Sequence, residues 1–173
     1  MVVSAEERKE QKAETKQLKQ CIEFILEECR MVLPGIQALF GFQLIAVFNE
    51  RFHLLAQGDR CVHLAAIFFA IASIGLMMGP AAYHRLTSPE SMPPELCSIG
   101  THLVCAGMAN LMFSIALEIY LVTRIILDSQ EIGIICGAIV LVFFASLWYL
   151  FPILNRRRDH EHHHNGTSTP VNL

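Results

Sequence analysis

The stretch Thr101–Leu154, THLVCAGMANLMFSIALEIYLVTRIILDSQEIGIICGAIVLVFFASLWYLFPIL, decides the fold of this chain. It contains two apolar runs, Thr101–Leu127 and Ile132–Leu154, which a short polar link separates. At a rise of ~1.5 Å per residue, a helix of either length crosses a hydrocarbon layer of roughly 30 Å. Because the link is so short, we expect these two helices to lie antiparallel in a tight hairpin.

Two earlier runs, Met31–Phe48 and Cys61–Tyr83, have the same character and bring the expected spans to four. The 173 residues are 53% hydrophobic and only 17% charged, which is more apolar than a soluble domain. We therefore predict an all-α fold, a four-span transmembrane helical bundle with an amphipathic N-terminal cytoplasmic helix. The expected parts are this charged helix at 1–30, the transmembrane domain at 31–154 and a disordered, His-rich tail at 155–173.

Apolar residues recur at helical spacing before the first span and form one stripe: Leu18, Cys21, Ile22, Ile25, Leu26 and Cys29. Such a stripe either lies flat on the membrane surface or packs on a partner helix, and the pattern leaves both open. Pro34 follows the stripe. Because proline frees the carbonyl group of Arg30, we expect an elbow in the chain near residues 30–35.

Small residues are spread through the apolar runs. Two pairs, Gly75-x-x-x-Gly79 and Gly133-x-x-x-Gly137, allow helices to approach closely, either within one chain or between copies, and we favour packing within the chain. Since none of the cysteines forms a C-x-x-C pair, we interpret them as small apolar residues rather than metal or redox ligands. The six cysteines are Cys21, Cys29, Cys61, Cys97, Cys105 and Cys136.

The distribution of basic residues predicts an orientation. Lysines and arginines are concentrated before the first span, and others stand between the second and third spans at Arg85 and after the fourth span at 156–158. The opposite flanks carry Arg51, Arg60 and Arg124. Since cytoplasmic flanks are the richer in Lys and Arg, we expect both termini of this multi-pass protein in the cytoplasm.

Polar side chains inside the spans are costly and are therefore candidates for function. Glu118, in the outer half of the third span, is the strongest, because an isolated carboxylate there must be protonated or paired. Gln43 and His63 lie at similar depth, Asn110 lies deeper, and Ser114 falls on a similar face of the third span. This group either holds an ion or relays a proton, or it forms a hydrogen-bonded clamp between helices.

A second polar group lies at the inner ends of the spans: Arg30, Gln37, His84, Arg85 and His102. His84 and His102 either face each other, as histidines that ligate haem or a metal do, or they meet lipid headgroups. Further histidines stand in the tail, at His160, His162, His163 and His164. They are candidate ligands for a divalent transition metal, but a flexible tail offers no preformed geometry, and we expect no resident cofactor.

Three motifs carry a family resemblance: Glu28-x-Arg30-x-x-Leu33-Pro34-Gly35-x-Gln37, Phe48-x-x-Arg51-Phe52 and Pro80-Ala81-Ala82-Tyr83-His84-Arg85. With them the chain resembles a family of small bacterial four-helix integral membrane proteins of unknown function, whose members are sometimes named sodium–proton antiporters automatically. The resemblance implies four spans and a bacterial inner (plasma) membrane. It also directs attention to the inner ends of the first two spans, either as a structural joint or as an anion or headgroup site.

Nothing in the chain matches a nucleotide-binding or hydrolytic motif, and we expect no enzyme. The function we favour is that of a structural, regulatory or accessory membrane protein. The alternatives are a small proton-coupled or cation transporter that uses Glu118, and a haem- or metal-binding membrane protein. The expected partners are the lipid bilayer and either a second copy or another membrane protein, and nucleic acid is not expected.

Overall fold

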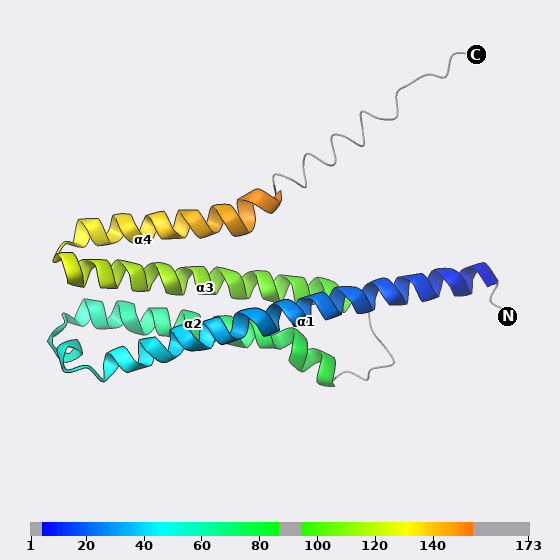
Figure 1. Ribbon diagram of the computed structural model, residues 1–173, viewed down its shortest axis with the longest axis horizontal. Coiled ribbons are helices and arrows are strands. Elements are labelled where there is room, and N and C mark those ends of the chain that lie inside the picture. The colour runs from blue at the N-terminus through cyan, green and yellow to red at the C-terminus, as the bar shows by residue number, and fades with distance from the viewer. Residues whose placement is uncertain (1–4, 87–94, 154–173) are drawn as a thin grey trace, which may run out of the picture.

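The computed structural model describes residues 5–86 and 95–153, and every regular element in these two segments is helical. The tail histidines of the sequence analysis lie outside the described residues. The elements in chain order are α1 (Ala5–Val47), η1 (Glu50–Leu54), α2 (Gln57–Leu86), α3 (Glu95–Leu127), α4 (Gln130–Ala145) and η2 (Ser146–Leu150). Figure 1 labels the four α-helices.

Four helical segments are long and apolar enough to cross a membrane, which confirms the predicted four-span, all-α bundle. Their bounds are Lys12–Val47, Gln57–Tyr83, Cys97–Leu127 and Gln130–Ile153. The chain is therefore a multi-pass membrane protein. We call the end of the bundle where α2 and α4 begin the outer end, and the opposite end the inner end, after the predicted orientation.

Helices α2 and α3 form the centre of the bundle, with α1 against both of them and α4 against α3 on the far side (Figure 1). The core joins side chains of the three helices α1, α2 and α3, among them Ile25, Ile36, Met77, Val104 and Leu111. Many other large apolar side chains are exposed, above all along α4. This distribution is expected where lipid, rather than water, surrounds the helices.

The α3–α4 hairpin is as tight as predicted. Asp128 turns the chain with φ 49°, and Ser129 caps α4 by accepting a hydrogen bond from the backbone N–H of Ile132. Gly137 lies so close to α3 that a Cβ atom there would be 3.1 Å from the carbonyl oxygen of Ala116. The Gly133–Gly137 pair therefore packs within the chain.

The N-terminal stripe and the first span form one helix, because α1 continues through Pro34 (Figure 1). The expected elbow does not interrupt it. Cys29 and Ile36 lie in the core on either side of the proline, so both halves of α1 pack on the bundle. Ile22 and Ile25 are buried as well, and Ile25 contacts Gly100 of α3. The stripe thus packs on partner helices and does not lie flat on a membrane.

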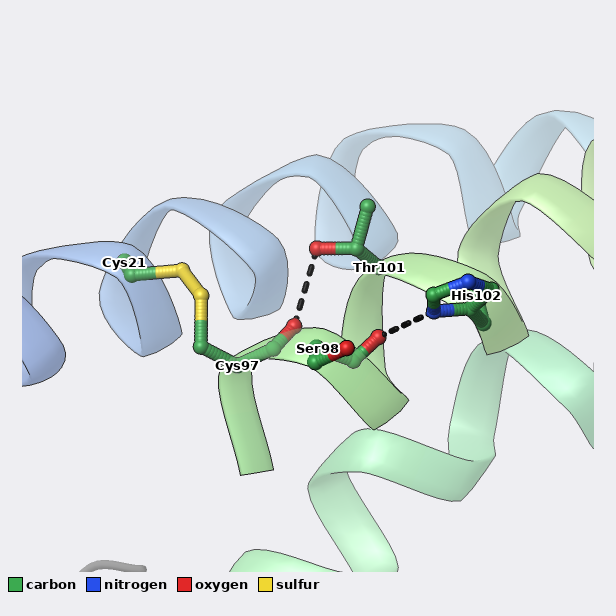
Figure 2. The surroundings of a disulfide bond; sticks show 5 residues. All are labelled: Cys21, Cys97, Ser98, Thr101 and His102. Atoms are coloured by element: carbon green, nitrogen blue, oxygen red, sulfur yellow. Dashed lines mark hydrogen bonds between the residues drawn. A yellow bond between two sulfur atoms is a disulfide. The ribbon is translucent and has the colours of Figure 1, made fainter. Parts of the chain in front are cut away.

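Cys21 of α1 and Cys97 of α3 form a disulfide bond, shown in Figure 2. Their Cα atoms are 6.2 Å apart, within the range that disulfides require. For these two cysteines the interpretation as apolar filler was wrong, since helix docking brings together residues that are 76 positions apart. Cys29 is free and buried in the core, as that interpretation expected.

The disulfide is expected to contribute to stability, because it closes a long loop. We predict that Cys97→Ser lowers the free energy of unfolding in detergent by about 2–4 kcal/mol, whereas Cys61→Ser, which removes an exposed free thiol, changes it by less than about 0.5 kcal/mol. Denaturant titration measures both variants. Equal stability of the two variants, or maleimide labelling of Cys21 and Cys97 without reductant, would contradict the bond.

Candidate functional site

Three helices bring polar side chains together in the outer half of the bundle. Gln43 comes from α1, His63 from α2, and Ser114 and Glu118 from α3. The two α3 residues are four positions apart and therefore share one helix face. Gln43 and His63 are 4% and 3% exposed and Ser114 is fully buried, so water does not satisfy these groups. We call these four residues the outer cluster.

Hydrogen bonds within the outer cluster join all three helices. The Gln43 Nε2 atom donates to Ser114 Oγ at 3.1 Å, and Ser114 Oγ donates in turn to the carbonyl oxygen of Ala66 at 2.9 Å. His63 Nε2 donates to the carbonyl oxygen of Gln43 at 3.0 Å. Ser114 thus connects α1 to α2 through a single hydroxyl group.

His63 also meets Glu118. Its Nδ1 atom lies 3.0 Å from Glu118 Oε1, close enough for an ion pair, although the alignment is too poor for a hydrogen bond. Because Nε2 donates to Gln43, an ion pair at Nδ1 joins an imidazolium group to a carboxylate. His63 is 3% exposed and Glu118 is 16% exposed, so the contact lies in a largely buried site.

Two buried oxygens of the outer cluster retain hydrogen-bonding capacity. Gln43 Oε1 and Glu118 Oε1 have no aligned donor among the residues of segments 5–86 and 95–153. Buried acceptors of this kind are uncommon in folded proteins. A proton or a small polar species that reaches these two oxygens would form hydrogen bonds that the described residues do not supply.

Asn110 does not join the outer cluster. Its side-chain amide donates to the carbonyl oxygen of Ala106, four residues earlier in the same helix, at 2.8 Å. Of the four residues predicted to form the outer site, the structure brings Gln43, His63 and Glu118 together, and Ser114 takes the connecting role. Ser114 stands on the same helix face as Glu118, and that spacing is the sequence signal that identifies it.

Two further polar links join α2 to α3, and the sequence analysis did not single them out. At the outer end, the buried carboxylate of Asp59 pairs with Arg124, whose guanidinium also donates to the hydroxyl of Tyr120 at 3.3 Å. Deeper in the bundle, Ser73 Oγ donates to the carbonyl oxygen of Gly107 at 2.8 Å. The sequence signal for the ion pair is that Asp59 stands at the start of α2 and Arg124 at the end of α3, and these two ends lie side by side in antiparallel helices.

The residues predicted at the inner end are more dispersed. Arg30 and Arg85 both line one groove between α1 and α2, while Gln37 is exposed on α1. His102 Nδ1 donates to the carbonyl oxygen of Ser98 within α3 at 2.7 Å (Figure 2). The side chain of His84 lies outside the described residues. Among the residues that are described, no three His, Cys, Asp or Glu side chains gather into a metal site.

Residues 10–152 match a family described as "Family of unknown function (DUF6328)". The match begins within α1 and extends past η2, so it includes more than half of the chain and reaches into all four candidate spans. It is consistent with the family of unknown function that the motifs resemble. No curated protein and no solved structure matches the chain.

The connecting role of Ser114 is open to a direct test. We predict that Ser114→Ala lowers the free energy of unfolding by about 1 kcal/mol, because it leaves the buried amide of Gln43 without an acceptor. Ser146→Ala is the matched control, since Ser146 is less buried and bonds to Val142 of its own helix. The control should change stability by less than about 0.5 kcal/mol, and an equal loss in both variants would refute the clamp.

Proposed function

We propose that this chain, which belongs to the DUF6328 family of unknown function, is a structural or regulatory membrane protein that serves as an accessory to other membrane components. The observation that carries this proposal is the use of its buried polar side chains. Gln43, His63 and Ser114 bond across helix boundaries, and each bond has a main-chain or side-chain partner on a different helix. Such an arrangement fixes helices relative to one another.

The continuity of the helices supports the same proposal. Secondary transporters usually bind substrate near the bilayer midplane with broken helices, and two inverted repeats move against each other. Here α1, α2 and α3 each run unbroken past the level of the outer cluster. The Ser73–Gly107 bond and the Asp59–Arg124 pair tie α2 to α3 at two further depths. Helices joined at several depths favour a rigid scaffold.

An accessory protein also needs a surface for its partner inside the membrane. Helix α4 packs on α3 and exposes large apolar side chains along its remaining faces, among them Ile135, Ile139 and Phe143. Lipid or a helix of another membrane protein, or of a second copy, fits this chemistry. The one charged residue of α4 is Glu131 at its start, and α4 has no Lys or Arg, so this surface does not suit nucleic acid.

We further propose that the protein resides in a bacterial plasma membrane with both termini in the cytoplasm, which the basic flanks support. The Cys21–Cys97 bond then lies toward the cytoplasmic side, where stable disulfides are rare. A fluorescent protein that matures only in the cytoplasm, fused after Leu173, tests the orientation. We expect fluorescent cells. A full-length fusion that is not fluorescent would place both termini outside the cytoplasm, and the Cys21–Cys97 bond would then lie on the side where disulfides are stable.

The absence of intrinsic ion transport is the central prediction of the accessory role. Purified protein in liposomes that contain a pH-sensitive dye should dissipate an imposed pH gradient no faster than empty liposomes do, with Na⁺ or K⁺ present. Glu118→Gln should behave as the wild type, because the carboxyl group has a structural role. Glu131→Gln, at the exposed start of α4, is the matched control.

The opposite result would be decisive for the transporter alternative. If the wild type and Glu131→Gln carried protons and Glu118→Gln did not, the His63–Glu118 pair would be a proton site and the accessory role would be wrong. If no variant carried protons, purification from native membranes under mild detergent should recover a membrane partner in fixed stoichiometry.

A further inference from the structure

A groove between α1 and α2 at the inner end combines two cationic side chains with an apolar floor. Arg30 comes from α1 and Arg85 from α2, and the floor between them includes Leu33, Met78 and Ala81. Its volume is about 250 Å³. Pockets that enclose a drug-sized ligand measure ~300–1,000 Å³, so this groove holds only part of a larger molecule.

The groove lies where the apolar segment of α2 ends. That segment ends at Tyr83, and Arg85 follows two residues later. Met78 and Ala81 of the floor lie within the segment, about 7 Å and about 3 Å before its end at a rise of ~1.5 Å per residue. The apolar floor therefore lies in the hydrocarbon layer, and Arg85 lies at its boundary with the headgroups.

The charge of the groove is not neutralised within the described chain. The structure gives ion pairs to His63 and Arg124, but it gives none to Arg30 or Arg85 within segments 5–86 and 95–153. Both arginine side chains are exposed. A guanidinium binds phosphate through directed, often bidentate hydrogen bonds, and two of them beside an apolar surface complement an anionic amphiphile.

We propose that the Arg30–Arg85 groove binds an anionic phospholipid of the surrounding bilayer. The two guanidinium groups hold the phosphate, and the start of an acyl chain lies over the apolar floor. The position at the hydrocarbon boundary and the partial enclosure favour a lipid over free phosphate, because free phosphate makes no use of the apolar surface. This site lies at the other end of the bundle from the outer cluster and does not depend on the accessory role.

The test measures lipid affinity of the full chain in detergent by native mass spectrometry, with thermal stability as a second readout. Phosphatidylglycerol, phosphatidylcholine and inorganic phosphate are the three probes. Wild-type protein should prefer phosphatidylglycerol, and Arg30→Gln with Arg85→Gln should weaken its binding about 30-fold, which equals ~2 kcal/mol at 1.4 kcal/mol per factor of ten. Arg60→Gln, an exposed arginine at the outer end, should leave the affinity unchanged.

A second variant separates the apolar floor from the charges. Met78 is 47% exposed, so Met78→Trp should fold and narrow the groove, and it should weaken phosphatidylglycerol binding while both arginines remain. The proposal is overturned if phosphatidylcholine binds as tightly as phosphatidylglycerol or if inorganic phosphate stabilises the protein to the same extent. It is also overturned if the double variant retains wild-type affinity.

Discussion

The structure depends on one constraint: a polar group in the hydrocarbon layer must find its hydrogen-bond partner within the protein. Ser114 shows how the chain meets it. A single hydroxyl group accepts from Gln43 of α1 and donates to the backbone of α2 at Ala66, while itself belonging to α3. No apolar side chain of the same size joins three helices in this way. This bond adds to apolar packing in fixing the position of α1 against the α2–α3 pair.

The sequence predicts the four spans well, because length and hydropathy are local properties and membrane thickness sets the scale. It also predicts that Gln43, His63 and Glu118 lie at one depth, since residue counts along spans measure depth. It does not predict which way each side chain turns. Asn110 bonds to its own helix, and nothing in its spacing excludes that choice. The Cys21–Cys97 bond arises from docking of α1 on α3, which no local pattern encodes.

The two ends of the bundle differ in how their charges are used. At the outer end, Asp59 and Arg124 neutralise each other between α2 and α3. At the inner end, a covalent bond ties α1 to α3, while Arg30 and Arg85 have no ion-pair partner among the described residues. The ion pair at the outer end stabilises the contact between α2 and α3. The two arginines at the inner end remain able to bind anions from the surroundings. Lipid composition would therefore act on the inner end first.

Two of the three motifs of the family resemblance lie at this inner end, and the structure gives them two physical roles. Pro80 is buried, with its side chain beside Gly100 of α3, and so it sets how closely α2 approaches α3. Arg30, Leu33 and Arg85 instead line the groove between α1 and α2. A purely structural joint would need only the first role, because packing does not call for two exposed arginines. That both roles fall within the same short motifs is why we place ligand recognition at the inner end and helix clamping at the outer end.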